Sequence, residues 1–252
     1  MIVNRKRLSL YVMSKQDDIL ANLRKTLSEE GIDSFHILEE LIPIEEQIEY
    51  FRYFEKIRLE NEPFDRDHEI ALLFSPDVSI ERKKLSLCKL ASVPDIGAYR
   101  SIETYHSSPL EPELQNWSAM ALVSSRIVLS SDLSGHQQIY ISSGLGGHEK
   151  KLRFFALFTT ADRKPFTDLQ KEIVEREFRF QLEMSDIEIE KFEIHDNYFT
   201  LLILFPFEID VKSILDAAIS ECNQYGNFLD ERYLFTNLKI LSEQEIERLL
   251  SK

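Results

Sequence analysis

Glycine is scarce in this sequence, with seven residues among 252, and proline contributes only eight. So little of either excludes collagen-like, low-complexity and loop-dominated chains. Cysteine is scarcer still, because only Cys88 and Cys222 are present, each inside a helical pattern. We interpret both as small buried side chains of a protein from a reducing compartment, and a disulfide between them is the less favoured alternative.

Long hydrophobic runs are also missing. No apolar stretch approaches the length of a membrane span. The basic residues Arg5–Arg7 are followed only by the short apolar run Leu8–Met13, whereas a signal peptide needs a longer one and a cleavage site. We therefore expect a cytoplasmic protein that makes no membrane contact.

Positive charge is in deficit. The chain has 30 Lys and Arg against 44 Asp and Glu, a net charge of −14 that is shared about equally by the residues before and after 139. Such a field repels phosphates at long range, because nucleic-acid binding needs Lys and Arg to replace condensed counterions. The charge therefore predicts that nucleic acid is not a partner.

Helical spacing of apolar residues dominates the chain before residue 136. Pro and Gly residues and N-capping side chains divide this part into segments. The predicted helical segments are Ser14–Gly31, Phe35–Leu41, Ile44–Leu59, 67–74, Ser79–Val93, Ile96–His106 and Glu113–Leu129.

The helices from Ser79 to Leu129 resemble HEAT-type helical repeats. The resemblance rests on the Pro94-Asp95 turn, the second helix GAYRSIETY and the next helix start PELQNWSAMAL. No copies align at a fixed period. The resemblance implies a packing or protein-binding role without catalytic residues.

After residue 136 the period changes and strands alternate with helices. Thr167 with Gln170, and Ser242 with Glu245, form capping boxes. The apolar parity of the strand Ile187–Ile194 switches, which predicts a bulge near Lys191. The expected order is strand Leu152–Phe158, helix, strand Ile187–Ile194, strand Thr200–Phe205, helix after Asp210, and strand Tyr233–Leu241.

This β-α-β-β-α-β order resembles a ferredoxin-like fold. A strand at Ile139–Ser142 would add a fifth strand if it paired with Leu152–Thr160. The predicted class is therefore α+β, with an all-α, HEAT-like domain over residues 1–135 and a ferredoxin-like domain over 136–252. Because this fold hosts enzymes, regulators and binding modules, it does not by itself name a function.

The sole glycine cluster lies where the two patterns meet, and four basic side chains follow it. Glycines permit close backbone approach, and amides with cations can hold a phosphate or carboxylate. The predicted ligand-binding residues are Gly144, Gly146, Gly147, His148, Lys150, Lys151 and Arg153. Neither a P-loop nor a dinucleotide-binding fingerprint is present. A plain connection between strands or domains is the simpler interpretation.

Histidine gives no metal-binding motif, so we predict no metal and no cofactor. His195, in a turn before a buried strand, resembles the position of a histidine in the small single-strand transposases of ferredoxin-like topology. Their paired-histidine motif is absent, because Asp196 and Asn197 follow His195. The activity of that family is therefore not carried over, and no catalytic residue is assigned.

These observations together favour a non-enzymatic intracellular protein that serves in protein–protein interaction, scaffolding or regulation, with a protein as its partner. The alternative is a regulatory protein or enzyme that binds an anionic small molecule or nucleotide at the glycine loop 143–153. A nucleic-acid role for the sheet ranks third, because the sheet lacks an exposed pattern of aromatic and basic residues.

Overall fold

The computed structural model describes residues 35–60, 62–135, 139–141, 143–206 and 208–251. The predicted helix Ser14–Gly31 and the N-terminal basic segment lie outside these residues. The described residues form two compact units, one within 34–146 and the other within 147–252. No helix of the described residues is long and apolar enough to span a membrane.

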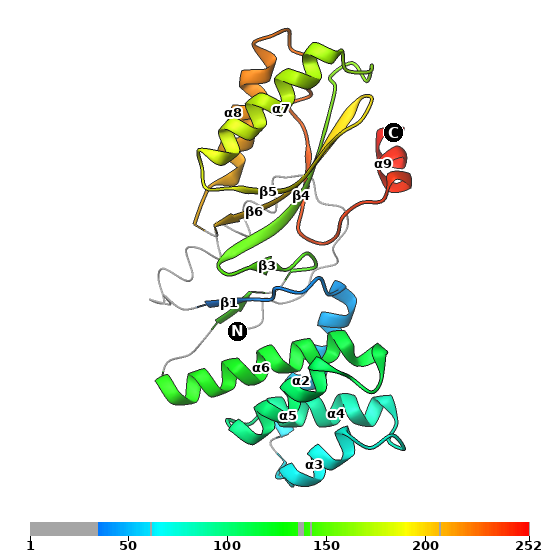
Figure 1. Cartoon of the computed structure of the whole chain (residues 1–252), viewed down its shortest axis with the longest axis vertical. Coiled ribbons are helices and arrows are strands. Elements are labelled where there is room, and N and C mark those ends of the chain that lie inside the picture. The colour runs from blue at the N-terminus through cyan, green and yellow to red at the C-terminus, as the bar shows by residue number, and fades with distance from the viewer. Residues whose placement is uncertain (1–34, 61, 136–138, 142, 207, 252) are drawn as a thin grey trace. The chain divides into compact units, whose positions relative to one another are not determined.

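The first unit, called here the helical unit, is mainly α-helical (Figure 1). Side chains of Asp65, Ser79 and Asp95 accept hydrogen bonds from the first turns of the helices that they precede. Its elements are β1 (Phe35–Ile37), α2 (Ile44–Glu60), α3 (Arg66–Leu73), α4 (Ile80–Ala91), α5 (Ile96–Ser107), the 3₁₀ turn η1 (Pro112–Leu114), α6 (Gln115–Ser134) and β2 (Ile139–Ile141).

Strands β1 and β2 pair in parallel, in a two-stranded sheet of their own. The strand predicted at Ile139–Ser142 is thus present, but its partner is Phe35–Ile37 and not the strand after the glycine loop. The predicted helical segment Phe35–Leu41 is correspondingly wrong at its start, which is extended. The apolar spacing of such a short segment does not distinguish a helix from a strand.

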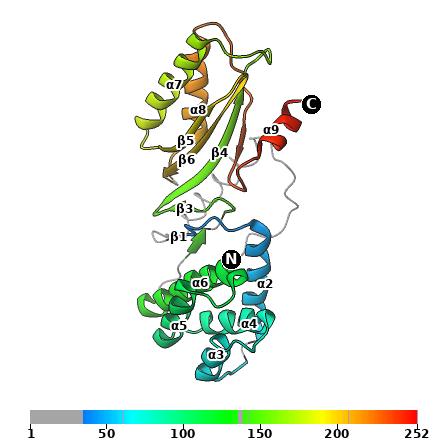
Figure 2. The same ribbon diagram turned by 45° about the vertical axis from the view of Figure 1, so that its right-hand side comes forward.

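The second unit, called here the α/β unit, mixes helices with an antiparallel sheet, and it gives the chain its α+β class. Helices α7 and α8 lie against one face of the sheet, and α9 lies on the other side (Figures 1 and 2). Its elements are β3 (Gly147–His148), β4 (Lys151–Thr159), α7 (Asp168–Glu183), β5 (Glu188–Ile194), β6 (Tyr198–Pro206), α8 (Val211–Asn223), β7 (Leu234–Thr236) and α9 (Glu243–Leu250).

The sheet order is β3-β4-β6-β5, and β7 pairs with β4 beside β3. The register between β5 and β6 shifts between Ile189 and Lys191, which confirms the predicted bulge. Both predicted capping boxes are present. Strand β7 is much shorter than the predicted strand Tyr233–Leu241.

Aromatic rings fill the space between the sheet and its helices. Phe158 of β4 stacks on Phe199 of β6 with ring centroids 4.7 Å apart. Phe178 of α7 makes edge contacts with both rings. Successive side chains of a strand point to opposite faces of the sheet. Phe158 faces the helices, so Lys151 and Arg153, at odd-numbered positions of β4, face the other side.

Candidate functional site

The glycine loop is packed against the helical unit to which its first part belongs. Gly146 has a φ of +61°, and a Cβ there would lie 2.7 Å from the carbonyl oxygen of Glu40. The side-chain amide of Gln47 donates to the carbonyl oxygens of Ile42 at 2.7 Å and Ser143 at 2.9 Å. Glycine at position 146 therefore serves a close contact between two backbone segments.

Two of the basic side chains, Lys151 and Arg153, belong to the α/β unit and contact carboxylates there. Lys151 Nζ lies 2.7 Å from Glu188 and 3.3 Å from Asp186. The hydrogen bond to Glu188 is the main cause of the raised pKa of Lys151. Arg153 binds both carboxylate oxygens of Glu190, at 2.5 and 2.8 Å.

The seven predicted ligand-binding residues are thus divided. Gly144 and Gly146 fall in the helical unit, whereas Gly147, His148, Lys150, Lys151 and Arg153 fall in the α/β unit. Gly147 and His148 pair with the start of β4 in a tight hairpin, and Lys150 is exposed at its turn. A ligand-binding role for this set stays a prediction.

The cysteines and histidines do not form a reactive centre in the described part of the chain. Cys88 and Cys222 are free thiols, and both are buried. Burial raises the pKa of both, to about 12 for Cys222, which disfavours the nucleophilic thiolate. Among the described residues, no group of three His, Cys, Asp or Glu side chains could hold a metal ion.

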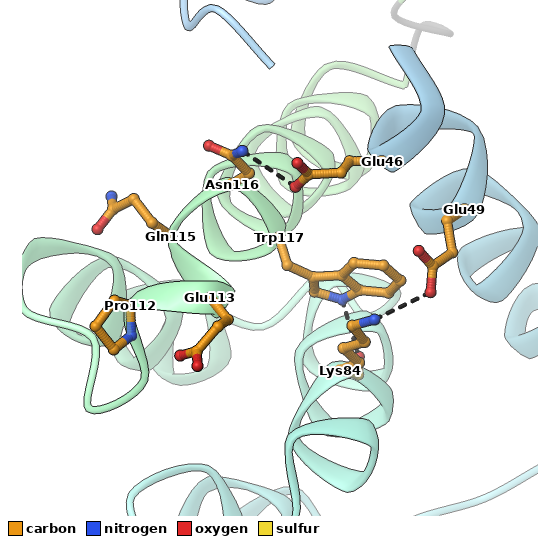
Figure 3. Close-up of a pocket in the computed structure, with 8 residues that line it drawn as sticks. All are labelled: Glu46, Glu49, Lys84, Pro112, Glu113, Gln115, Asn116 and Trp117. Carbon is orange, nitrogen blue, oxygen red and sulfur yellow. Dashed lines mark hydrogen bonds and ion pairs between the residues drawn. The ribbon is translucent and has the colours of Figure 1, made fainter. Parts of the chain in front are cut away.

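A hollow of about 380 Å³ opens on the helical unit between α2, α4 and the start of α6 (Figure 3). Lys84 Nζ contacts Glu49 at 3.0 Å and lies 4.6 Å above the ring of Trp117. The indole Nε1 donates to the carbonyl oxygen of Lys84, and Asn116 donates to Glu46. The hollow is lined by Glu46, Glu49, Lys84, Pro112, Glu113, Gln115, Asn116 and Trp117.

Several polar groups that line this hollow already bond to one another. Burial alone would lower the pKa of Lys84, but Glu49 and Glu81 raise it overall, so the ammonium stays charged. The excess of carboxylates disfavours an anionic ligand. The hollow is therefore a place where α2 is tied to α4 and α6.

Three loops meet at one end of the α/β unit, and we call them the loop platform: residues 160–167, 195–197 and 227–232. Backbone hydrogen bonds tie them together, from Thr160 and Phe166 to the β5–β6 turn and from Ala161 to Phe228. The amide of Asn197 also donates to the carbonyl oxygen of Arg163, at 3.2 Å. The three loops therefore form a cross-linked surface.

Three cationic side chains are exposed on the loop platform. Arg163 has a left-handed backbone with a φ of +63°, which is rare outside glycine. Lys164 pairs with Asp162 and is 79% exposed, and Arg232 pairs with Asp230 and is 85% exposed. Both Arg232, by its hydrogen bond, and Arg163, by its charge, lower the pKa of Asp230.

An aromatic pair flanks the same platform. The rings of His195 and Tyr198 are stacked, with centroids 4.3 Å apart and planes 15° apart, and both residues are partly exposed. Burial raises the pKa of Tyr198, and the nearby carboxylates of Glu243 and Glu247 raise it further. The platform thus combines hydrogen-bond donors with a stacked surface, although acidic residues surround it.

No protein-family model matches the sequence, and no curated protein matches it. Two solved structures resemble part of the chain. One is a candidate transposase from Deinococcus radiodurans, with 15% identity and a TM-score of 0.34, and the match covers 42% of this chain and 90% of that chain. The other is a REP-associated tyrosine transposase bound to a REP hairpin, with 11% identity, a TM-score of 0.32, and coverage of 40% and 64%.

This finding corrects two predictions from the sequence. Both similar structures are transposases, which runs against the predicted non-enzymatic interaction or scaffold protein. The bound REP hairpin contradicts the prediction that nucleic acid is not a partner. That prediction rested on the net charge of the whole chain, whereas binding depends on the local arrangement of charges. At these identities and TM-scores the likeness assigns no role to any residue here.

The sequence did not predict the loop platform as a site. Arg163, Asn197 and Arg232 are far apart in the sequence, and none belongs to a motif. The left-handed conformation of Arg163 has no sequence signal, since glycine or asparagine is the usual residue there. Only the turn at His195-Asp196-Asn197 was indicated by its composition.

Proposed function

We propose that the α/β unit is a ferredoxin-like module that binds nucleic acid through its loop platform. The name of the fold is proposed from the element order β4-α7-β5-β6-α8-β7 and the sheet order β7-β4-β6-β5. Likewise, the HEAT-like description of α4 to α6 and a domain boundary after residue 135 are proposals about architecture alone.

The observation that carries this proposal is the backbone of Arg163. Holding a non-glycine residue in the left-handed region costs about 1 kcal/mol or more, and residues strained in this way cluster at functional sites. Hydrogen bonds from Thr160 and Asn197 to the neighbouring carbonyl groups maintain the loop in this form. The guanidinium of Arg163 is thereby carried on a fixed loop next to a second arginine, Arg232.

Carboxylates on the platform already pair with two of its three cations. Lys164 and Arg232 pair with Asp162 and Asp230 at 3.0 Å. The Lys164–Asp162 pair is exposed, and exposed ion pairs contribute little, about 0 to 1 kcal/mol each, so a phosphate oxygen can compete for that cation. Since the whole chain carries −14, the interaction will be weak at physiological salt and steeply salt-dependent.

Strand cleavage is not part of the proposal. The paired-histidine motif of the small single-strand transposases is absent at His195. No group of three His, Cys, Asp or Glu side chains in the described part of the chain could hold a metal ion. The proposed role is binding of nucleic acid, with no chemical step on it.

Fluorescence anisotropy with a labelled DNA hairpin, measured at several salt concentrations, tests the proposal. The triple variant R163A/K164A/R232A removes the platform cations. We expect at least about tenfold weaker binding and a salt slope smaller by about 3, one unit for each lost phosphate contact. The matched control K191A/K239A/R248A removes the same charge from other exposed positions of the α/β unit and should change affinity much less.

Two results would overturn the proposal. One is the absence of hairpin binding by the unmodified protein at low salt. The other is equal weakening by the platform variant and the control variant, since that would show only a general response to charge.

A further inference from the structure

The loop platform carries a side-chain amide that is not used within the described part of the chain, that of Asn227. Asn227 is exposed, and no described group bonds to its side chain. The other amide of the platform, on Asn197, already donates to the carbonyl oxygen of Arg163. The amide of Asn227 therefore keeps both its donor and its acceptor for a ligand.

The backbone that carries Asn227 is held in place by hydrogen bonds. The side-chain amide of Asn223 bonds the backbone N–H and carbonyl of Leu229, at 2.9 and 3.1 Å. The N–H of Ala161 donates to the carbonyl oxygen of Phe228 at 2.9 Å. A side chain on such a fixed loop loses less conformational freedom when it binds.

The bond between Ala161 and Phe228 also brings Asn227 near a platform cation. Arg163 comes two residues after Ala161, and Asn227 directly precedes Phe228. Neighbouring extended segments joined by such a bond lie about 5 Å apart. A phosphate at Arg163 and a base at Asn227 therefore fall within about two nucleotides of each other.

We propose that the side-chain amide of Asn227 hydrogen-bonds to adenine in the nucleic acid that the loop platform binds, an inference that rests on the proposed function. The amide presents a donor beside an acceptor. Adenine presents the acceptor N7 beside the donor N6, so two hydrogen bonds join them. Guanine offers two acceptors on the same edge, and cytosine and thymine offer one donor or one acceptor.

Carboxylates on the platform favour the same base. Asp196 and Glu231 are exposed in two of its three loops. Carboxylates accept hydrogen bonds and cannot donate them when ionised, so they attract the amino group at N6 of adenine and repel the acceptors N7 and O6 of guanine. The acidic surroundings that weaken phosphate binding therefore favour adenine over guanine.

Fluorescence anisotropy with two labelled DNA hairpins tests the inference. One hairpin has adenines in its stem and loop, and the other has 7-deazaadenine at the same positions, which removes the N7 acceptor and keeps base pairing. The unmodified protein should bind the 7-deazaadenine hairpin at least about fivefold more weakly. Asn227→Gly should bind both hairpins equally. Glycine removes the amide and adopts the left-handed backbone at this position, where φ is +50°, without strain.

Two further variants separate the amide of Asn227 from other effects. Asn227→Asp keeps the shape of the side chain but loses the donor to N7, so it should also lose the preference for adenine. Gln244→Ala is the matched control, because it removes an exposed amide from α9 of the same unit, and it should keep the full preference.

The outcomes distinguish this inference from the proposed function. Equal binding of the two hairpins by the unmodified protein, or a preference that survives in Asn227→Gly, would refute the contact with adenine. Hairpin binding that is still lost in R163A/K164A/R232A would then leave the platform as the binding surface. If the unmodified protein binds neither hairpin at low salt, both the inference and the proposed function are wrong.

Discussion

Arg153 and Glu190 are joined across an intervening strand. Arg153 lies on β4 and Glu190 on β5, and the guanidinium extends over β6 to bind both carboxylate oxygens, at 2.5 and 2.8 Å. Glu190 is the extra residue of the β5 bulge. A bulge changes the direction in which a side chain points, and the residue at this bulge is the one whose carboxylate binds Arg153.

The Arg153–Glu190 pair is expected to contribute more to the free energy of unfolding than an exposed ion pair does. Glu190→Gln should lower the free energy of unfolding by about 1 kcal/mol, because it replaces a bidentate charged contact with a weaker one. Glu193→Gln, which breaks the exposed pair with Lys191, should change it by less than about 0.5 kcal/mol. Chemical denaturation of both variants measures the two values, and equal losses would contradict the expectation.

Substituting Gly146 and Gly135 by alanine separates two costs, the steric clash of an added Cβ and the strain of a left-handed backbone. Both have positive φ, +61° and +67°, but only Gly146 has backbone atoms within 3 Å of where a Cβ would lie. Gly135→Ala should cost about 1 kcal/mol from backbone strain alone. Gly146→Ala should cost about 1 to 3 kcal/mol more because of overpacking. Thermal and urea unfolding measure the difference, and similar costs at both positions would show that the glycine loop is not held as described.

Lys83 and Glu111 form an ion pair, and we expect substitution of Glu111 to lower the free energy of unfolding more than substitution of Lys83. Lys83 is fully buried, and its Nζ lies 2.6 Å from Glu111. Tyr105 also donates to Glu111, and the pKa of Tyr105 is raised by burial and then by that carboxylate. Glu111→Ala should cost about 3 kcal/mol or more, because it leaves a buried ammonium without a counterion.

Lys83→Met provides the matched measurement. Replacing the buried ammonium with an apolar side chain of similar length removes the charge and its desolvation cost together. The loss of stability should be about 1 kcal/mol or less. If Lys83→Met is the more damaging change in equilibrium unfolding, the ion pair is net stabilising and this expectation is wrong.

Glu69 predicts a pH dependence of stability. The carboxylate is almost fully buried and contacts Arg82 and Lys89 at 2.8 and 3.0 Å. Burial alone would raise its pKa, but hydrogen bonds from Lys89, Ser86 and Arg82 lower it below the ordinary value. A lowered pKa in the folded state contributes stability above the pKa of the unfolded chain, and that contribution is lost as the pH falls through the folded pKa.

The test compares Glu69→Gln with the unmodified protein at neutral and at acid pH. The variant should be less stable by about 2 kcal/mol at neutral pH, and the gap should narrow as the pH falls below about 4, where the carboxylate of the unfolded chain takes up a proton. Urea unfolding at a series of pH values measures this gap. A gap that stays constant or widens on acidification would contradict the described contacts of Glu69.

Much of the fold could be predicted because its signals are local. The helix starts at Ser79 and Asp95, the capping box at Thr167 and the bulge beside Lys191 each depend on residues only a few positions apart. The candidate site could not be predicted in the same way. Arg163 and Arg232 flank Asp230 only because two loops, about 70 residues apart in sequence, are tied to the same strand end.

The sequence alone determined the α+β class and the order of helices and strands from β4 onward. Those features follow from apolar periodicity and capping, which act within one or two turns of chain. The tertiary structure decided that β2 pairs with Phe35–Ile37, that Gly146 fits against the carbonyl of Glu40, and that Arg153 binds Glu190. Each of these contacts joins residues that are distant in sequence. The packing of whole helices and strands brings them together, and no local sequence pattern indicates which residues will meet.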